Sequence, residues 1–583
     1  MSTVERIDGR DLHSPAGLAR RIRVARGEEA GDLLLTGGQV VNVFTRRVEP
    51  GNIIICDGFT AGVGLHSWQA EETIPIDGQF IMPGLIDAHI HLESTLLTPA
   101  EFARLAVPHG TTAVIADPHE IANVLGVRGV ELLLAASEGL PVDCYLMAPS
   151  CVPASPWESA GAALDAEAIA SLLEYPRVIG LAEMMNFPGV SGADEQVLAK
   201  ITAARQRGRV VDGHAPGLRG RDLVAYAAAG VRSDHECTTA DEAIERADLG
   251  MLVQIREGSA ARNLDTFIPL ILEDRLGDWA LCTDDVHPDD LLEHGHINAL
   301  LRRLITAGVP PAVAVRHASL IPARHYGLND RGAIAPGIRA DLAVVPDLVE
   351  SRPHLVIKNG QIVAEDGRCL VESPPLPAEV ENTVHLGPLS ESLFRLAVPD
   401  GECDVIGVVP DQIVTRHLRV KVGSAGGYWV FDPDEDLALI ACIHRHEPTG
   451  RCGLGLVKGF GFTGHGALAS TVAHDAHNLL IMGTNAKDML VAAEALKHAG
   501  GGLAVVMNGK VTAQLELPLA GLISTLRAEQ VCGRQRELAR AAAALGCRLP
   551  SPFGTLSFLG LSVIPELRIT DRGLLDTVTL RRV

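Results

Sequence analysis

The fold of this chain is decided by one stretch, Phe80-Ile-Met-Pro-Gly-Leu-Ile-Asp-Ala-His-Ile-His91. It is an apolar run that contains the turn-forming pair Pro83-Gly84 and ends on His89 and His91. In an extended strand, residues two positions apart point to the same side, so the two imidazoles can share one metal ion. Two polar residues at a strand end would explain this pair equally well, so its interpretation depends on the rest of the chain.

Other apolar runs also end on residue types that bind metals. Glu183, His214, His235 and Asp284 each follow such a run, and a helix-length stretch separates each from the next. This alternation indicates parallel strands joined by crossover helices. Counting the first stretch, the predicted strands cover residues 80–91, 112–116, 144–148, 178–184, 210–214, 231–235, 251–256 and 280–284.

These eight strand–helix units extend over about 250 residues, the usual size of a closed (β/α)8 barrel, whose active sites lie at the C-terminal strand ends. All the polar candidates follow strand ends of this kind. A doubly wound open sheet would alternate in the same way, but it would not need a histidine or an acid at so many strand ends. We therefore predict an α/β fold with a TIM-like barrel.

The barrel sequence interrupts a β-rich region. Short strand and turn patterns before residue 79 resume at residues 341–364, as expected for the two halves of one split β-sandwich around an inserted domain. After Pro374-Pro-Leu-Pro377, a plausible linker, comes an α+β block with a helix predicted over residues 486–498. The predicted domains are 1–79 (an amphipathic helix and the first half of the sandwich), 80–331 (the barrel), 332–375 (the second half) and 385–583 (the C-terminal domain).

Composition excludes some classes of partner. The 583 residues carry a formal charge of −22, which argues against nucleic acid because phosphate binding depends on clustered Lys and Arg. No apolar run reaches the roughly 18 residues that a membrane span needs, and residues 1–10 lack the basic-then-apolar order of a signal peptide. We expect a cytoplasmic protein with a small-molecule substrate and no membrane partner.

The cysteines do not indicate disulfides or a structural zinc. There are 11, without regular spacing and without a C-x-x-C pair, so we expect small core residues. One class of zinc deaminase pairs H-x-E with P-C-x-x-C. His91-Leu-Glu93 matches the first half of that pattern, but the second half is missing.

The histidines and acids at the strand ends have the chemistry of a metal site. Imidazole nitrogen and carboxylate oxygen bind zinc, manganese and iron. Four histidines and two acids are enough for two divalent ions, which lower the pKa of a bound water toward neutrality. Each residue alone is better explained by ordinary hydrogen bonding. Asp284, at the last strand, is positioned to carry a proton.

The motifs resemble those of a known family. The stretch from Pro83 to His91, with a split β-sandwich around the barrel, resembles the amidohydrolase superfamily, and further motifs are similar to those of bacterial adenine deaminases along nearly the whole chain. These are Asp117-Pro-His-Glu-Ile-Ala-Asn123, Gly180-Leu-Ala-Glu-Met-Met185, Asp212-Gly-His-Ala-Pro-Gly217, Arg256-Glu-Gly-Ser-Ala-Ala-Arg-Asn263, Cys282-Thr-Asp-Asp285 and Val472-Ala-His-Asp-Ala-His-Asn478.

The resemblance implies a hydrolytic deamination of adenine to hypoxanthine and ammonia, a reaction of purine salvage, by a metal-bridging hydroxide that attacks C6. It implies two divalent ions per chain, with Mn²⁺ or Fe²⁺ expected first and Zn²⁺ as the alternative. The implied ligands are His89, His91 and Asp284 for one ion, His214 and His235 for the other, and Glu183 as the bridge. Asp284 would carry the proton, with His235 as a second catalytic residue.

The residues that hold the purine are less well defined by the sequence. Glu120, Arg256 and Glu257 follow predicted strands and are placed to bind ring nitrogens, although Arg256 and Glu257 pairing with each other or with nearby loops remains the alternative. For the whole chain, the alternatives are another superfamily hydrolase acting on a cyclic amide or a pyrimidine, and a catalytically inactive scaffold. A homo-oligomer, dimer or tetramer, is expected.

The C-terminal block contains a dense polar run, Val472-Ala-His-Asp-Ala-His-Asn478. We expect residues 385–583 to help cover the active site, because a closed pocket orients the substrate and excludes water. Hydrogen bonding within the block, or a subunit contact, is the alternative.

Overall fold

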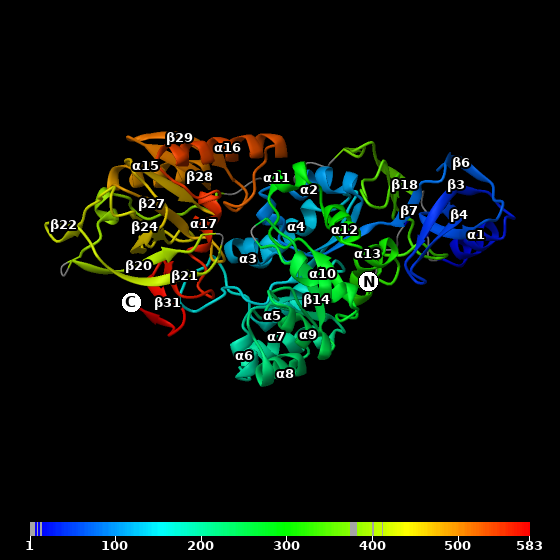
Figure 1. Cartoon of the computed structure of the whole chain (residues 1–583), viewed down its shortest axis with the longest axis horizontal. Helices are drawn as coiled ribbons and strands as arrows, with labels where there is room; N and C mark the ends of the chain where they lie inside the picture. The colour runs from blue at the N-terminus through cyan, green and yellow to red at the C-terminus, as the bar shows by residue number, and fades with distance from the viewer. Residues whose placement is uncertain are drawn as a thin grey trace.

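The computed structural model describes residues 6–7, 10–11, 14–259, 261–372, 382–398, 401–410 and 412–583. Figure 1 shows three parts in a row: an N-terminal sheet, a central barrel and a C-terminal domain. The expected linker at residues 374–377 lies outside the described residues. Within the described ranges, no helix is long and apolar enough to cross a lipid bilayer.

The central part is a ring of eight strands that follow one another in chain order, as a parallel sheet of five and a parallel sheet of three. At one seam the Arg232 N–H donates to the Val211 carbonyl (3.0 Å), and at the other the Asp284 N–H donates to the His89 carbonyl (2.9 Å). These bonds close the ring and confirm the predicted barrel. The strands are β8 (Leu85–Ile90), β9 (Thr111–Ala116), β10 (Asp143–Ala148), β11 (Val178–Met184), β12 (Val210–Gly213), β13 (Ser233–Asp234), β14 (Leu252–Arg256) and β15 (Trp279–Cys282).

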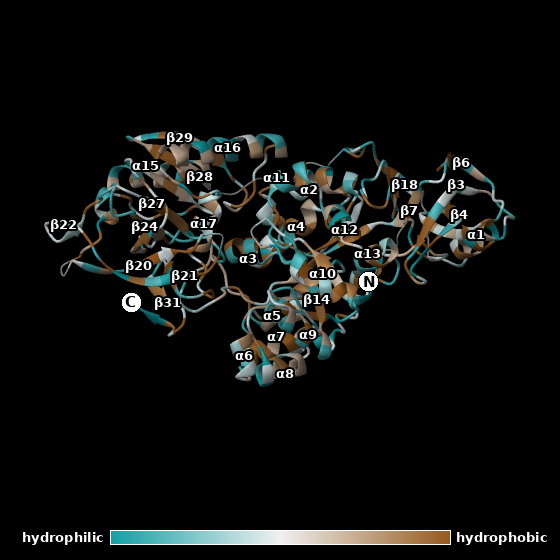
Figure 2. Ribbon diagram, viewed as in Figure 1, coloured by the Kyte–Doolittle hydropathy of each residue, from teal (hydrophilic) through white to brown (hydrophobic). Residues whose placement is uncertain are grey.

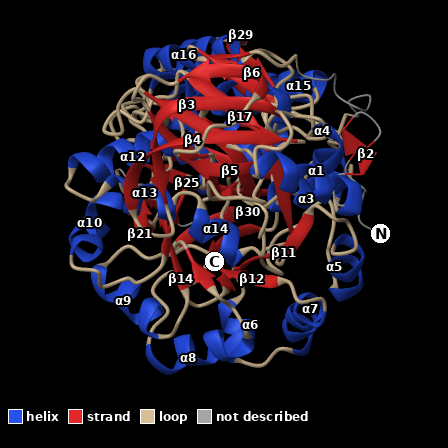
Figure 3. Cartoon of the chain, turned by 90° about the vertical axis from the view of Figure 1, so that its right-hand side faces the viewer, coloured by secondary structure: helices blue, strands red, loops and turns tan. Residues whose placement is uncertain are grey.

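Helices surround this ring, and Figure 3 shows α5, α7, α8, α9 and α10 outside the strands. Several begin at a side chain that accepts the free N–H groups of the first turn: Asp165 for α5, Asp194 for α7 and Thr239 for α9. The helices are α2 (Pro99–Ala106), α3 (His119–Leu125), α4 (Val127–Ala136), α5 (Ala166–Leu172), α6 (Phe187–Ser191), α7 (Glu195–Gln206), α8 (Gly220–Ala229), α9 (Ala240–Asp248), α10 (Leu264–Leu272), α11 (Pro288–Glu293), α12 (Ile297–Thr306), α13 (Pro311–His317) and α14 (Leu320–His325).

The stretch predicted as one strand, residues 80–91, forms two strands in different sheets. β7 (Phe80–Pro83) lies in the N-terminal sheet, and β8 enters the barrel. The chain turns at Gly84, where a Cβ atom would lie 2.2 Å from Thr112 Oγ1. Glycine is required here because the Thr112 side chain occupies the space that a Cβ atom would fill. This corner directs β8, and with it His89 and His91, into the barrel.

The two β-rich halves of the sequence share one nine-stranded sheet, in which β7 pairs with β3 from the first half and β16 from the second. The sheet is curled, and the Thr60 N–H near one edge donates to the carbonyl of Ile338, which lies outside its strands (2.8 Å). Helix α1 (Pro15–Ala25), capped by Ser14, packs against it. The other strands are β3 (Gly31–Asn42), β4 (Arg47–Cys56), β5 (Phe59–Gly64), β6 (Ala70–Pro75), β16 (Leu342–Val345), β17 (Leu355–Lys358), β18 (Gln361–Glu365) and β19 (Arg368–Cys369), with a separate hairpin of β1 (Arg6–Ile7) and β2 (Arg10–Asp11).

The C-terminal domain contains an eight-stranded sheet with helices on both faces. Helix α15 (Ala486–Ala499), close to its predicted range, packs on one face, and α16 (Ala528–Ala544) packs on the other. The remaining elements of this domain are β20 (Glu402–Val408), β21 (Thr415–Lys421), β22 (Ser424–Ala425), β23 (Tyr428–Trp429), β24 (Leu437–Ile443), β25 (Cys452–Lys458), β26 (Gly466–Ser470), β27 (Leu479–Gly483), β28 (Gly502–Met507), β29 (Lys510–Glu516), α17 (Pro552–Phe558), β30 (Leu567–Thr570), β31 (Gly573–Asp576) and β32 (Arg581–Arg582). Of the short 3-10 turns, η1 (Leu92–Thr95) and η2 (Val107–His109) lie between β8 and β9, and η3 (Glu391–Phe394) precedes β20.

The barrel and the C-terminal domain share a hydrophobic core. One continuous buried cluster includes Ile90 and Phe102 of the barrel and Leu480 and Leu556 of the C-terminal domain. In Figure 2 apolar residues gather on the strands, whereas outer helices such as α16 also carry hydrophilic residues. Polar contacts join the same two parts, for example the Ser524 N–H to the Leu96 carbonyl (2.9 Å). The C-terminal domain is therefore packed on the barrel.

The corner at Gly84 generates a stability prediction with a matched control. Gly84→Ala forces the new methyl group against Thr112, and such overpacking costs about 1–3 kcal/mol. Gly533→Ala, in α16 with open space around the added Cβ, should stabilise the protein by up to about 1 kcal/mol because alanine favours helix. Urea unfolding of both variants checks the prediction, and shifts of the same sign would contradict it.

Candidate metal centre

His89 and His91, at the end of β8, meet Asp284 beyond the end of β15. The two Nε2 atoms are 3.2 Å apart, and Asp284 Oδ1 lies 3.1 Å from His91 Nε2 and 3.6 Å from His89 Nε2. His91 Nδ1 lies 3.1 Å from the Asp117 carbonyl oxygen. A carbonyl can only accept, so Nδ1 carries a hydrogen and Nε2 is the nitrogen directed at Asp284 and His89. Imidazole nitrogens and a carboxylate oxygen thus face one another in a buried site.

The backbone and Arg256 hold Asp284 in this position. Asp284 has a φ of +57°, in the left-handed region that few non-glycine residues adopt. Its N–H and C=O both bond to the end of β8, and Arg256 Nη1 donates to its Oδ2 (2.9 Å). Oδ1 is therefore directed at the two histidines. Backbone conformations of this kind persist where the surroundings fix them, and they cluster at functional sites.

Glu183, on β11, lies between two groups of imidazoles. Its Oε1 is 3.6 Å from His91 Nε2, while its Oε2 is 2.7 Å from His214 Nδ1 and 3.1 Å from His235 Nε2. The side chain is buried, with an exposed fraction of 3%. Each oxygen of one carboxylate thus faces a different set of donors, the arrangement that a bridging ligand requires.

Glu236 joins the second group, although the sequence analysis did not identify it. Its Oε1 lies 3.7 Å from His214 Nδ1 and 3.6 Å from His235 Nε2. It also pairs with Arg256. The only clue in the sequence was its position directly after His235. This clue was not enough, because neighbours on a strand normally point to opposite faces.

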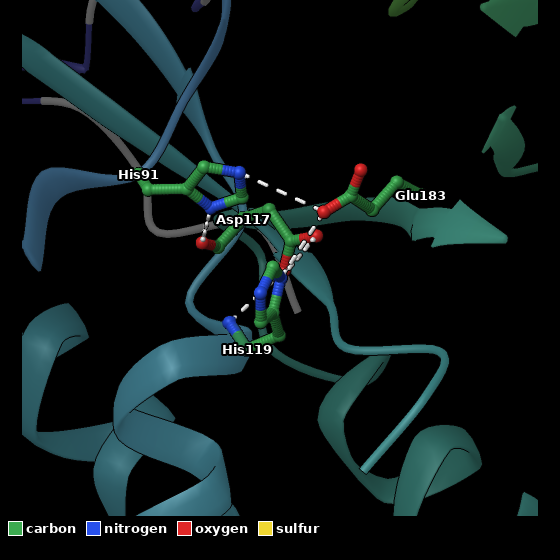
Figure 4. A group of neighbouring side chains, drawn as sticks. All are labelled: His91, Asp117, His119 and Glu183. Atoms are coloured by element: carbon green, nitrogen blue, oxygen red, sulfur yellow. Dashed lines mark hydrogen bonds and ion pairs between the residues drawn. The ribbon is translucent and has the colours of Figure 1, made fainter. Parts of the chain in front are cut away.

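Asp117 and His119 add donors that the sequence analysis missed. His119, the first residue of α3, places Nδ1 3.3 Å from Glu183 Oε1 and 3.2 Å from Asp117 Oδ2. In Figure 4 His91 and His119 both point toward Glu183, with Asp117 beside them. Asp117-Pro-His follows β9 just as the other ligands follow their strands, so the same strand-end argument would have found these two residues.

The two central carboxylates stay ionised at neutral pH. Burial alone would raise the pKa of Asp284, but hydrogen bonds from His89 and His91 and the charge of Arg256 hold this pKa well below its usual range. Burial also acts to raise the pKa of Glu183, and His214 and His235 hold it well below its usual range by charge and hydrogen bonding. The site therefore offers negative oxygens together with imidazole nitrogens.

This donor set fits divalent transition-metal ions. Imidazole and carboxylate are the ligands that zinc, iron and manganese accept, and Glu183, His89, His91 and Asp284 bring such atoms within a few ångströms. In addition, His235 Nδ1 is buried without a hydrogen-bond partner among the described residues. The candidate ligand groups among the described residues, each with donor atoms within 4.8 Å of one another, include His91–Asp117–His119–Glu183, His89–His91–Asp284, His89–Glu183–His235, His214–His235–Glu236 and Glu120–His474–His477.

Of the three residues expected to hold the substrate, two line the cavity over this site. Arg256 and Glu120 are among its lining residues. Glu257 is not: it pairs with Arg303 and accepts from the Leu264 N–H (3.0 Å) at the start of α10. The structure thus brings Glu257 to a neighbouring helix and not to the cavity.

Residues of the C-terminal domain form part of the cavity wall. Two imidazoles, of His474 and His477, contact the Glu120 carboxylate at the barrel mouth. Apolar side chains from the same domain complete the wall. The lining residues of this domain are Ile413, His474, Asp475, Phe558, Leu561, Val563 and Ile564.

Arg568 fixes the apolar part of this wall. Its guanidinium is buried, with no exposed surface, and donates to the backbone carbonyls of Ile564 (2.8 Å), Phe558 (2.7 Å) and Ile413 (2.7 Å). All three residues line the cavity. One side chain therefore ties Ile413 to the stretch from Phe558 to Ile564, which forms the rest of the apolar wall.

Similarity to known proteins agrees with this architecture. The family model "Amidohydrolase family" matches residues 80–363, and "Adenine deaminase C-terminal domain" matches residues 412–581. The adenine deaminase of Desulfatibacillum aliphaticivorans is 47% identical over 95% of this chain and 97% of its own length. That of Methanothrix thermoacetophila is also 47% identical over the same shares, and that of Kosmotoga olearia is 43% identical over 96% and 97%. The chain belongs to the adenine deaminase family.

Proposed function

We propose that this protein hydrolyses adenine to hypoxanthine and ammonia. The observation that carries the proposal is a carboxylate, Glu183, between two groups of imidazoles, in a chain whose relatives named adenine deaminase match it over nearly its full length. The site has no thiolate ligands among its described donors. A buried histidine–carboxylate site under a closed wall suits hydrolysis of a small heterocycle.

The proposed site holds two divalent ions. His89, His91 and Asp284 would hold one ion, His214 and His235 the other, and Glu183 would contact both; manganese or iron is favoured, with zinc as the alternative. When bound, the ions supply Lewis acidity that activates water near neutral pH. His119 and Glu236, which lie at the edges of these two groups, are further donors.

Asp284 is the proposed proton carrier. Its pKa, held well below the usual range, keeps the carboxylate ionised and able to accept a proton from water. Arg256 donates to Oδ2 and orients the carboxylate, which would accept the proton and then pass it to the departing amino group. His235, whose Nε2 lies beside Glu183 Oε2, would serve as a metal ligand. It would also assist the reaction from the side of the site opposite Asp284.

The substrate would lie between the histidine–carboxylate floor and the wall of the C-terminal domain. Glu120 and Arg256 supply polar contacts, and Phe558, Leu561 and Ile564 supply an apolar surface. A flat purine suits such a pocket, since small-molecule sites combine apolar walls with a few fixed polar groups. The wall also excludes bulk water from the reaction.

The first test is turnover after reconstitution. Metal-free protein loaded separately with Mn²⁺, Fe²⁺ or Zn²⁺ is expected to release ammonia from adenine, with activity rising until two equivalents per chain are bound. Ammonia release is measured with adenine, cytosine and hydantoin. Full activity at one equivalent would leave Glu183 without a bridging role, and turnover of cytosine or hydantoin but not adenine would favour a different superfamily hydrolase.

Asp284→Asn should keep the shape of the site and remove the proton acceptor. We expect kcat to fall by about 10²–10⁴-fold, the usual contribution of a general base. Metal content must be measured on the same sample, because Asp284 is also a proposed ligand. A variant that binds metal and turns over at the wild-type rate would assign proton transfer to another residue.

Glu120 and Glu257 form a matched pair for substrate binding. Glu120→Gln should lower kcat/KM by about 10-fold or more because a charged hydrogen-bond acceptor at the cavity is lost. Glu257→Gln should leave kcat/KM within a few-fold and lower stability instead, since Glu257 bonds Arg303 and α10. Steady-state kinetics and thermal unfolding of both variants separate these effects. The opposite ranking would return Glu257 to the substrate.

A further inference from the structure

The Glu120 carboxylate joins the barrel to the loop between β26 and β27. His474 Nδ1 lies 2.5 Å from Glu120 Oε1, and His477 Nε2 contacts Glu120 Oε2. Glu120 is on α3, more than 350 residues earlier in the chain. All three side chains are largely enclosed, with exposed fractions of 3%, 11% and 1%. Two imidazoles and one carboxylate in this arrangement are either a metal site or a hydrogen-bonded group.

The protonation of His477 decides between these two possibilities. The Ala473 N–H donates to His477 Nδ1 (3.0 Å), so Nδ1 holds a lone pair and Nε2 carries the hydrogen. Nε2 can therefore donate to Glu120 but has no lone pair for a metal ion. Burial lowers the pKa of His477 to about 4, which agrees with a neutral ring. The group is a hydrogen-bonded clamp on Glu120.

His474 has a ring nitrogen that the protein does not use. Because a carboxylate oxygen accepts, Nδ1 carries a hydrogen toward Glu120. Nε2 has no hydrogen-bond partner among the described residues. The ring stacks on Phe558, with centroids 4.7 Å apart and planes at 13°, and both side chains line the cavity. The contact with Phe558 fixes the plane of the imidazole, so Nε2 is held in one direction.

A hydrogen is available on this second nitrogen. Burial alone would lower the pKa of His474, but the charge of Glu120 and its hydrogen bond raise it to about 9. The ring is therefore an imidazolium at neutral pH and donates from both nitrogens. A charged donor at a cavity wall is suited to an acceptor on a bound ligand.

We infer that His474 is a further catalytic residue, which donates its Nε2–H to purine N1, the ring nitrogen bonded to C6, while Glu120 holds its Nδ1–H. This inference rests on the proposed function. Attack of water oxygen at C6 forms a C–O bond and moves the electron pair of the ring C=N bond onto nitrogen. A positioned donor stabilises that charge more in the transition state than in the substrate. Glu120 then acts through His474, and the C-terminal domain contributes to the chemistry as well as to the wall.

Two isosteric substitutions test the inference, because asparagine places an amide near Nδ1 and glutamine places one near Nε2. His474→Asn keeps the bond to Glu120 and loses the donor to the substrate, so kcat/KM for adenine should fall by about 100-fold. His474→Gln loses the bond to Glu120 and keeps a donor near the cavity, and its loss should be about 10-fold or less. The reverse order, or equal losses, would make His474 a residue that only positions Glu120 and would overturn the inference.

Controls separate this outcome from misfolding and from a wrong function. Both variants should match the wild type in metal content and in the midpoint of thermal unfolding. Competitive inhibition by 1-, 3- and 7-deazaadenine provides a second measurement. In the wild type, 1-deazaadenine, which lacks N1, should bind about 10-fold more weakly than the other two analogues, and His474→Asn should remove that difference. An unchanged inhibition pattern in His474→Asn would overturn the inference, whereas wild-type protein that releases no ammonia from adenine would overturn the proposed function and this inference with it.

Discussion

The free-energy cost of burying charged groups constrains the architecture of the barrel mouth. Glu183 and Asp284 are ionised carboxylates with little exposure to water, and isolated charges in such a place are strongly unfavourable. Each is compensated locally: Asp284 by Arg256 and two histidines, Glu183 by histidines on both sides. The eight-stranded ring makes this compensation possible because it brings the ends of distant strands to one place. The site and the closed barrel therefore require each other.

Much of the barrel could be predicted, because each strand is an apolar run that ends on a polar residue. The same rule located Glu183, His214, His235 and Asp284, and the structure brings them together. It failed at Gly84, where an apolar run continues through the corner although the chain changes sheets. A hydrophobic pattern predicts that a residue is buried, but it does not predict in which sheet the residue lies. The turn-forming pair Pro83-Gly84 stands at the corner, but it does not show that the strands on its two sides belong to different sheets.

Some parts of the site that the sequence did not reveal are held by long-range contacts. His474 and His477 meet Glu120 across more than 350 residues, and nothing local to any of these residues predicts the pairing. Glu257 shows the opposite error. It stands next to Arg256 at a strand end, yet it bonds to Arg303, because successive residues of a strand point to opposite faces. Spacing thus identifies candidates, and tertiary packing decides which of them reach the cavity.

The position of Arg568 in the chain determines when the pocket can be completed. Ile413, Phe558 and Ile564 all precede Arg568, and its guanidinium binds the carbonyl of each. During synthesis, domains fold from the N-terminal side as they emerge, so the barrel with its histidines is complete long before β30 leaves the ribosome. Until then the wall has no common anchor and the barrel mouth remains uncovered. Enclosure of the pocket therefore depends on residues that are made after the whole barrel.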